Sequence, residues 1–385
     1  MKLKTSKTIA LLALMANFAT AECLAQNTAE PKYVVNGYVG GYRGLVDTEA
    51  IEIEKLTHIN YAFVNVQDSM AVLTNLKTDS VNFRKLNELK YARNPDLKIL
   101  ISIGGWAWSE NFSDAVLTPT SRQLFAKSSV DIVRQYNLDG VDIDWEYPGM
   151  PGEEGNIYRP EDKQNYTLMF EEIRKELDKL STETGKEYQL TTAVGASESY
   201  IANTEMDKVS QILDYIFIMT YDYGGRNNTV NHHTNLYPSK SVVDGSSGHQ
   251  SVQNFIAAGT PPEKIVLGAA FYGKAFEATP GSKDGLAQPR AAAQGQGAAQ
   301  NQGGGYTKLL QTAINKNGYK RYWDKAAKAP YLFNKDTNVF ITYDDEKSIK
   351  EKVKYVKEHN LGGIFFWEYF SDPEGHLLNT IDSNL

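Results

Sequence analysis

The sequence predicts an α/β fold, a (β/α)8 TIM barrel with a small α+β insertion subdomain between strand 7 and helix 7. Eight short runs of β-branched and aromatic residues alternate with amphipathic stretches. Several of these runs are apolar on both faces, as in parallel sheets that helices cover. A doubly wound sheet, the alternative, usually carries a glycine-rich phosphate loop after its first strand, and no glycine cluster here has that spacing. The alternation therefore favours the barrel.

The individual elements follow from the hydrophobic periodicity. The predicted strands cover residues 34–42, 58–66, 98–106, 138–147, 188–196, 214–223, 264–273 and 362–370. After the fourth strand, apolar residues at helical spacing predict one buried helix face, formed by Tyr166, Phe170, Ile173, Leu177 and Leu180. The last predicted helix begins after Asp344 or Asp345 and ends at Gly362.

Residues 1–25 are predicted to be a signal peptide. Three lysines precede the apolar run 9–16, which is too short to span a bilayer, and small residues follow it. Cleavage is expected after Ala21 or Ala25, and the only cysteine, Cys23, lies in the same segment. We therefore expect a secreted or periplasmic protein with no membrane span.

The rest of the chain is predicted to be one catalytic barrel, 33–385, with an inserted α+β subdomain at 275–343. The gap between the seventh strand and the last helix is too long for a simple loop. Its second half recovers strand-like aromatic character, with Tyr319, Tyr322, Trp323, Tyr331 and Phe340. The aromatic density favours a subdomain over a decorative loop.

The composition narrows the possible partners. The net charge is −7 and no basic block is present, so nucleic-acid binding is not predicted. The 23 Tyr residues, with 15 Phe and 5 Trp, suit stacking on sugar faces as well as core packing. We expect a monomer.

Four acidic residues lie close together in the fourth predicted strand, LDGVDIDWEYPG (138–149). Side chains alternate on a strand, so Asp142, Asp144 and Glu146 share one face and Asp139 points the other way. The C-terminal strand ends of a barrel face its active site. Three carboxyls this close cannot all ionise freely, so at least one should hold a proton near neutral pH, as a general acid requires.

A metal site or a solvated acidic turn is the alternative for this run. Calcium loops place Gly and Asn between their oxygen ligands, whereas Val141, Ile143 and Trp145 stand there in this chain. The adjacent His232 and His233 lack an HExxH spacing, so we predict a loop or cleft-rim position for them. The chain also lacks a GxSxG motif. Neither a metal nor a cofactor is predicted.

Residues 139–146 resemble the DxxDxDxE signature of the chitinases of glycoside hydrolase family 18. Further matches follow in the family's order: Ser102-Ile-Gly-Gly-Trp106 is similar to its SxGG motif, Met219-Thr-Tyr-Asp222 to its sixth-strand motif, Phe271-Tyr-Gly-Lys-Ala-Phe276 to its seventh-strand motif, and Trp367 to its eighth-strand tryptophan. Together the matches run from about residue 33 to 372. The position of the insertion also resembles that of the insertion domain of many family members.

The resemblance implies substrate-assisted retaining catalysis, an exception to the usual pair of enzyme carboxylates. Glu146 would protonate the glycosidic oxygen, and the substrate's own N-acetyl carbonyl would attack the anomeric carbon. Asp144 would accept a hydrogen bond from the acetamido N–H, and Asp142 would share a proton with Asp144. The Tyr221 hydroxyl would donate to the acetamido oxygen.

The resemblance also implies substrate-binding residues, with Trp367 as the floor under the sugar that bears the acetamido group. The others are Trp106, Tyr38, Phe63, Met219, Asp222 and Lys274. Trp108 or Trp323 would add stacking at outer subsites or belong to the core. Lys274 stands where many relatives have Arg, so a bidentate contact at that position is in doubt.

The predicted function is that of an exported chitinase, which hydrolyses β-1,4-linked N-acetylglucosamine polymers. Chitin or N-acetylglucosamine oligosaccharides are the expected partners, and the choice between endo and exo action stays open. One alternative is an endo-β-N-acetylglucosaminidase that acts on glycoprotein glycans, although such relatives generally lack the insertion. The other is a chitin-oligosaccharide-binding lectin, but such proteins typically lose the acid that Glu146 represents.

Overall fold

The computed structural model describes residues 33–223, 228–242, 246–291 and 302–385. The predicted signal peptide, 1–25, lies outside the described residues. No helix in the described part of the chain combines the length and the apolar character that a membrane crossing requires.

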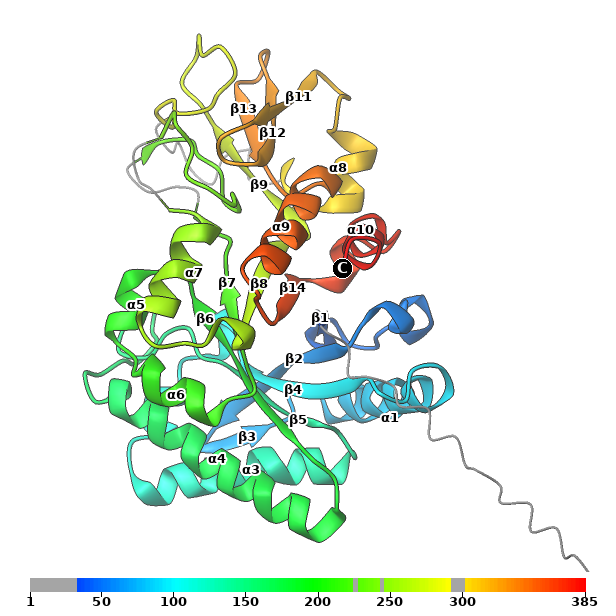
Figure 1. Cartoon of the computed structure of the whole chain (residues 1–385), viewed down its shortest axis with the longest axis vertical. Coiled ribbons are helices and arrows are strands. Elements are labelled where there is room, and N and C mark those ends of the chain that lie inside the picture. Colours follow the sequence, from blue (N-terminus) through cyan, green and yellow to red (C-terminus); the bar gives the residue numbers. More distant parts are fainter. Residues whose placement is uncertain (1–32, 224–227, 243–245, 292–301) are drawn as a thin grey trace, which may run out of the picture. The chain divides into compact units, whose positions relative to one another are not determined.

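Eight parallel strands close into a barrel (Figure 1), which confirms the predicted fold. The barrel strands are β1 (Val34–Gly40), β2 (His58–Gln67), β4 (Lys98–Gly104), β5 (Gly140–Asp144), β6 (Gln189–Gly195), β7 (Tyr215–Met219), β8 (Ile265–Ala270) and β14 (Gly363–Trp367). They pair in the order β1-β14-β8-β7-β6-β5-β4-β2, and a β1–β2 ladder closes the ring. A short strand, β3 (Met70–Val72), extends β2 as an antiparallel hairpin.

Helices cover the outside of the barrel. In Figure 1, α3, α4 and α6 lie on the outer side of the barrel strands. The helices are α1 (Leu76–Arg93), α2 (Phe112–Ala115), α3 (Pro119–Gln135), α4 (Asp162–Thr184), α5 (Glu198–Ala202), α6 (Met206–Ile212), α7 (Gly248–Ala257), α8 (Tyr306–Thr312), α9 (Glu346–Glu358) and α10 (His376–Asp382). All five apolar residues predicted for the α4 face are buried in the main core.

The helix predicted between Asp345 and Gly362 corresponds to α9, with two corrections. It ends at Glu358, and α10 follows β14, so α9 is not the last helix. The Asp345 side chain caps the start of α9 by accepting hydrogen bonds from the N–H groups of Lys347 and Ser348, both 3.0 Å long. Such a cap satisfies N–H groups that have no partner within the helix.

The insertion is a separate antiparallel sheet that lies between β8 and α9 in the chain. Its strands are β9 (Tyr272–Glu277), β10 (Gly304–Gly305), β11 (Tyr319–Asp324), β12 (Ala329–Asn334) and β13 (Val339–Thr342), in the order β10-β9-β13-β12-β11. Tyr331 and Phe340 belong to a small hydrophobic cluster of this sheet. The sheet begins at Tyr272, so the start predicted at 275 falls inside β9.

Asp139, which precedes β5, points away from the barrel interior into a buried ion pair, as the strand alternation predicts. Its carboxylate accepts from Lys90 Nζ at 2.7 Å and from the Ile99 N–H at 2.8 Å. Lys186 Nζ lies 2.9 Å away. Asp139 and Lys90 are 1% and 4% exposed, so the ion pair is buried.

Asp139→Asn should therefore destabilise the fold by about 3–5 kcal/mol, because Lys90 would remain buried without its counter-charge. Urea unfolding measures this loss. Asp131→Asn is the matched control, since it breaks an exposed Lys127–Asp131 pair and should cost less than about 1 kcal/mol. Equal midpoints for the two variants would contradict the assigned role of Asp139.

Candidate active site

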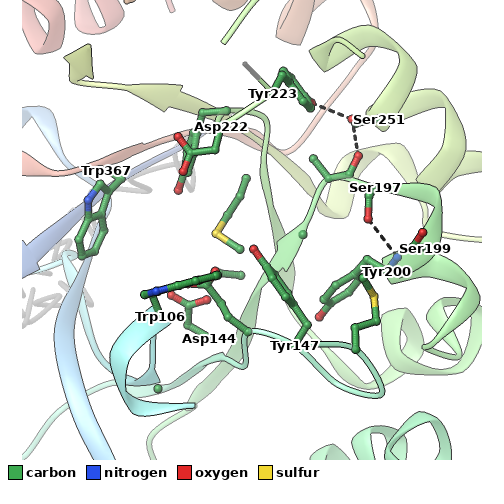
Figure 2. Close-up of a pocket in the computed structure, with 18 of the residues that line it drawn as sticks. Trp106, Asp144, Tyr147, Ser197, Ser199, Tyr200, Asp222, Tyr223, Ser251 and Trp367 are labelled. Carbon is green, nitrogen blue, oxygen red and sulfur yellow. Dashed lines mark hydrogen bonds between the residues drawn. The ribbon is translucent and has the colours of Figure 1, made fainter. Parts of the chain in front are cut away.

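A cavity of about 1100 Å³ opens at the C-terminal ends of the barrel strands. Figure 2 shows it with side chains from several strand ends converging on it. The predicted site residues that line it are Tyr38, Phe63, Trp106, Asp144, Glu146, Met219, Tyr221, Asp222 and Trp367. Asp142 and Lys274 are not among the lining residues.

Asp142 lies one layer below the cavity, inside the barrel, and is 0% exposed. Three hydroxyls donate to its carboxylate: Tyr38 Oη at 2.9 Å, Ser102 Oγ at 2.8 Å and Thr191 Oγ1 at 2.7 Å. Burial raises the pKa of Asp142 to about 6, although the three hydroxyl donors oppose the rise. This group is therefore an oriented carboxyl that can take up a proton near neutral pH.

Asp144 is the last residue of β5 and lies at the floor of the cavity. It is 4% exposed, and within the described residues its Oδ1 atom has no hydrogen-bond partner. Burial, the charge of Glu146 and the charge of Asp142 together raise the pKa of Asp144 well above its usual range. Such a setting favours the protonated form of Asp144 and leaves one buried oxygen without a partner among the described residues.

Glu146 also lines the cavity, but not as part of the predicted strand. The strand was expected to reach residue 147, whereas β5 ends at Asp144. Beyond it, side chains satisfy the backbone of Glu146. The Glu146 N–H donates to Ser109 Oγ at 2.8 Å, and its carbonyl accepts from Asn156 Nδ2 at 3.1 Å. Burial, together with the charge of Asp222, raises the pKa of Glu146 to about 7, a value suited to a general acid.

Asp222 lines the cavity and is held by three groups, in a left-handed backbone conformation with φ 63°. Tyr272 Oη donates to its Oδ1 at 2.6 Å, Lys274 Nζ lies 2.6 Å away, and His233 Nδ1 lies 3.4 Å away. Burial raises the pKa of Asp222, but His233 and Lys274 outweigh it and hold the pKa well below its usual range. Asp222 is therefore a fixed negative charge in the cavity.

The structure also places Lys274 and the two adjacent histidines relative to the cavity. Lys274, predicted to bind substrate, is not among the residues that line the cavity, and its Nζ lies 2.6 Å from Asp222 Oδ1. His232 and His233 lie in the loop between β7 and α7, as predicted, but both are buried, at 0% exposed. His232 Nε2 lies 3.3 Å from Asp324 and His233 contacts Asp222. Carboxylate partners within reach explain how these imidazoles can be buried.

One wall of the cavity is aromatic. The rings of Trp367 and Phe63 are nearly parallel, with centroids 5.4 Å apart. Tyr42 is nearly parallel to both, at 6.3 Å from Phe63 and 6.4 Å from Trp367. Trp106 is 48% exposed at the mouth. Rings presented in this way offer flat apolar faces on which sugar rings can stack.

The two undecided tryptophans have different environments. Trp108 lines the cavity and meets Phe63 edge to face, with centroids 6.2 Å apart. Trp323, on β11, is not a lining residue, and Lys347 Nζ lies 4.0 Å from its ring centroid. The cation covers one face of that ring, so Trp323 does not belong to this site.

Tyr221 also lines the cavity. Its ring contacts Tyr272 edge to face at 6.1 Å and Phe365 at 6.0 Å. Burial raises the pKa of the Tyr221 hydroxyl well above its usual value, with the charges of Asp144 and Asp222 adding to the effect. The hydroxyl therefore stays protonated and can act as a hydrogen-bond donor.

Sequence reasoning missed other lining residues. Tyr42 ends the first predicted strand and Tyr147 follows the acid, so position at a strand end could have identified both. The opposite wall is polar and comes from the starts of α5 and α7. It contains Ser197, Glu198, Ser199, Ser246, Ser247, Gln250, Ser251 and Asn254. In Figure 2, Ser197, Ser199 and Ser251 lie on the side of the cavity opposite Trp367. Nothing in the sequence marks these residues as members of a site.

The described residues contain no group of three or more His, Cys, Asp or Glu side chains that could hold a metal ion. Hydroxyls hold the Asp142 carboxyl, and a hydroxyl, a lysine and a histidine surround that of Asp222. The cavity therefore presents a carboxyl with a pKa of about 7, a second carboxyl with a raised pKa, a tyrosine hydroxyl and a wall of aromatic rings.

Comparisons with known proteins agree with this arrangement. Residues 34–372 match the glycosyl hydrolases family 18. The chain is 42% identical to Chitinase A1 of Niallia circulans over 79% of this chain and 44% of that protein. It is 31% identical to Chitinase B of Serratia marcescens over 86% of this chain and 76% of that protein.

A solved structure gives a similar result. The chain is 43% identical to a "novel glycoside hydrolase family 18 N-acetylglucosaminidase" from Paenibacillus barengoltzii. The TM-score is 0.83, and the match covers 92% of this chain and 100% of that one. Because it has the barrel, carries the carboxyls Asp142, Asp144 and Glu146 at the end of the fourth barrel strand, and matches the family over residues 34–372, the chain belongs to the glycosyl hydrolases of family 18.

Proposed function

We propose that the protein is an exported chitinase that hydrolyses β-1,4-linked N-acetylglucosamine chains by substrate-assisted retention. The observation that carries this proposal is the set of carboxyls at the end of β5. Glu146, with a pKa raised to about 7, stands beside a buried Asp144 whose pKa is also raised and whose Oδ1 atom has no partner among the described residues. Such a set supplies an acid and a charge stabiliser, and the substrate supplies the nucleophile.

In the first step Glu146 donates its proton to the glycosidic oxygen as the C–O bond breaks. The acetamido carbonyl oxygen of the same sugar attacks the anomeric carbon and forms a cyclic oxazolinium ion. Asp144 transfers its proton to Asp142 and turns to accept the acetamido N–H, so that its negative charge stabilises the ion. The three hydroxyls around Asp142 hold that carboxyl in place.

In the second step Glu146, now ionised, removes a proton from a water molecule. The water oxygen attacks the anomeric carbon, the ring of the ion opens, and the acetamido group is restored. Attack occurs twice at the same carbon, so the anomeric configuration is retained. The Tyr221 hydroxyl orients the acetamido oxygen, and Trp367 supports the sugar ring.

The names of the relatives support N-acetylglucosamine chains as the substrate class, but they suggest two modes of action, cleavage within a chain and release of single units. Both curated relatives above carry the name chitinase, whereas the Paenibacillus barengoltzii enzyme is called an N-acetylglucosaminidase. Release of single N-acetylglucosamine units is therefore the second candidate. The N-terminal charge and hydropathy pattern of residues 1–25 supports export.

Product analysis by mass spectrometry with chitohexaose tests the proposal. Short N-acetylglucosamine oligomers are expected, and early accumulation of the monomer alone would favour the second candidate. If wild type leaves chitohexaose intact but cleaves a high-mannose glycoprotein, the chitinase proposal is wrong and the endo-β-N-acetylglucosaminidase alternative holds. Binding without cleavage of either substrate would indicate a lectin.

The charge of Asp222 should set the upper limit of the pH range for activity. Glu146 must be protonated to act, so kcat/KM should fall as pH rises through the raised pKa of Glu146, near 7. Asp222→Asn removes a negative charge that favours the protonated form, so the alkaline limb should move to lower pH. Asp214→Asn, which breaks an ion pair with Arg174 outside the cavity, should leave the limb in place. An unshifted limb in Asp222→Asn would exclude this role.

A further inference from the structure

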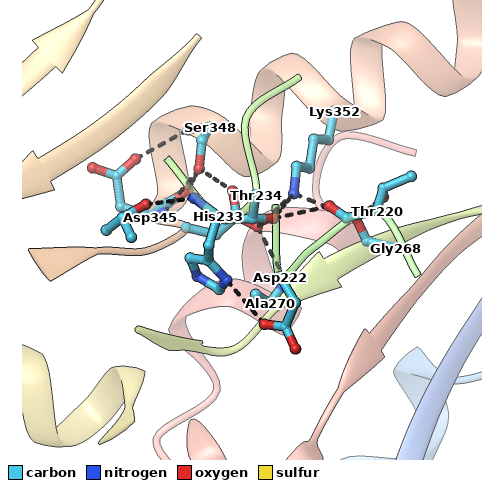
Figure 3. Close-up of polar contacts among 11 residues, drawn as sticks. Thr220, Asp222, His233, Thr234, Gly268, Ala270, Asp345, Ser348 and Lys352 are labelled. Atoms are coloured by element: carbon cyan, nitrogen blue, oxygen red, sulfur yellow. Dashed lines mark hydrogen bonds and ion pairs between the residues drawn. The ribbon is translucent and has the colours of Figure 1, made fainter. Parts of the chain in front are cut away.

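A buried lysine–aspartate pair lies behind the β7 end of the cavity and has no part in the proposed chemistry. Lys352, on α9, and Asp344, which follows β13, are each 1% exposed, and Lys352 Nζ lies 2.6 Å from Asp344 Oδ2. Figure 3 shows Lys352 reaching from its helix towards the strand ends. A buried ion pair adds little net stability compared with apolar residues of the same size. The hydrogen-bond partners of the pair therefore say more about its role than its contribution to stability does.

The Asp344 carboxylate joins several segments. It accepts from the Ala270 N–H at 3.1 Å, at the end of β8, and from Thr234 Oγ1 at 3.0 Å. Its other oxygen accepts from Ser348 Oγ at 2.7 Å, in the first turn of α9. With Lys352, four donors converge on one buried carboxylate, so its position is tightly defined.

Thr234 connects this pair to the segment after β7. Its hydroxyl accepts from Lys352 Nζ at 2.6 Å and lies 3.3 Å from the Thr220 carbonyl oxygen. Lys352 Nζ also donates to the Gly268 carbonyl at 3.3 Å, and Thr220 Oγ1 donates to the same carbonyl at 2.7 Å. Thr220 directly precedes Tyr221, the proposed donor to the acetamido oxygen.

The residue before Thr234 reaches the second group of the site. His233 Nδ1 lies 3.4 Å from Asp222 Oδ1, and the contact is drawn in Figure 3. The His233 N–H donates to Thr342 Oγ1 at 3.0 Å, which ties this residue to the last strand of the insertion. Thr234 and His233 therefore support the backbone before Tyr221 and the side chain of Asp222 from behind.

We propose that Lys352 and Asp344 are positioning residues that act through Thr234 on Tyr221 and Asp222. The last residue of β7 is Met219, so the strand ladder no longer holds Tyr221. Beyond the ladder this segment is held by a backbone hydrogen bond from the Tyr223 N–H to the His233 carbonyl, 3.0 Å long, and by the side-chain contacts of Thr234 and Thr220. The inference rests on the proposed function, because the role of Tyr221 is assigned there. A misplacement of about 1 Å can cost about 10²-fold in rate even when it originates away from the chemistry.

Thr234→Val tests this inference, because it removes the bridging hydroxyl and keeps the volume. Thr234→Ser restores the hydroxyl and is the conservative rescue. Thr307→Val is the matched control, since it removes a 3.0 Å threonine–aspartate hydrogen bond, to Asp372, outside the cavity. For each variant, kcat and KM with chitotetraose and the melting temperature are measured.

The expected result for Thr234→Val is a kcat at least about tenfold lower with KM within about twofold of wild type, because orientation matters most in the attack step. Thr234→Ser should recover most of kcat, and Thr307→Val should lower the melting temperature without lowering kcat. A kcat for Thr234→Val within about twofold of the Thr307→Val value would overturn the inference, as would a change confined to KM.

A variant that does not fold and a wild type that is inactive are treated separately. If Thr234→Val does not fold, Thr220→Val replaces it, because it removes the neighbouring hydroxyl bond to Gly268, and the same criteria apply. Wild type that fails to cleave chitotetraose would contradict the proposed function. Active wild type with an unaffected variant contradicts only the positioning role.

Discussion

Glu146→Gln should lower kcat on chitohexaose by about 10²–10⁴-fold, the usual contribution of a general acid. The amide has nearly the same shape and keeps the backbone contacts to Ser109 and Asn156, so folding should be preserved. It carries no acidic proton, so the leaving group would depart as an alkoxide. KM, or the affinity for chitotriose by calorimetry, should change far less than kcat.

Glu154→Gln is the matched control for this variant. Glu154 lies in the same β5–α4 loop but is exposed and outside the cavity, so its activity should equal that of wild type. Retention of more than about a tenth of the wild-type kcat by Glu146→Gln would exclude Glu146 as the general acid. The proton donor would then have to be sought among the other carboxyls of the cavity.

Tyr221→Phe should lower kcat by about 10²–10³-fold, similar to the loss of one preorganised donor in other enzymes. The phenyl ring keeps the contacts to Tyr272 and Phe365, so only the hydroxyl is lost. Without it, the acetamido oxygen is not held for attack, and its developing charge is less stabilised. The loss should be similar in kcat and kcat/KM, since the donor acts mainly in the transition state.

Tyr237→Phe serves as the control, because Tyr237 lies outside the cavity and should tolerate the change. A second measurement concerns the nucleophile. Chitotriose with a thioacetamido or trifluoroacetamido group would alter the wild-type rate strongly if the acetamido oxygen attacks. A rate for Tyr221→Phe within about threefold of wild type would remove Tyr221 from the mechanism.

The order of elements was predictable from the sequence because two local periods alternate along the chain. Runs such as 98–106 are apolar on both faces, while the α4 residues from Tyr166 to Leu180 follow the helical period. Strand ends were less predictable. The run around Glu146 has strand-like composition, yet β5 ends at Asp144 because contacts from Ser109 and Asn156 replace the ladder. Ser109 follows a different strand and Asn156 lies further along the loop, so the local composition of the run does not reveal them.

The candidate site, too, was only partly predictable from the sequence. The sequence by itself determined which way the carboxyls of this strand point: Asp139 outward and Asp144 toward the cavity. Side chains alternate between the two faces of a strand, and this alternation is a local property of the chain. Only the tertiary structure decided that Lys274 pairs with Asp222 and that Lys352 reaches Thr234. These contacts join residues from separate elements, so their distances and burial depend on how the whole barrel and its insertion pack.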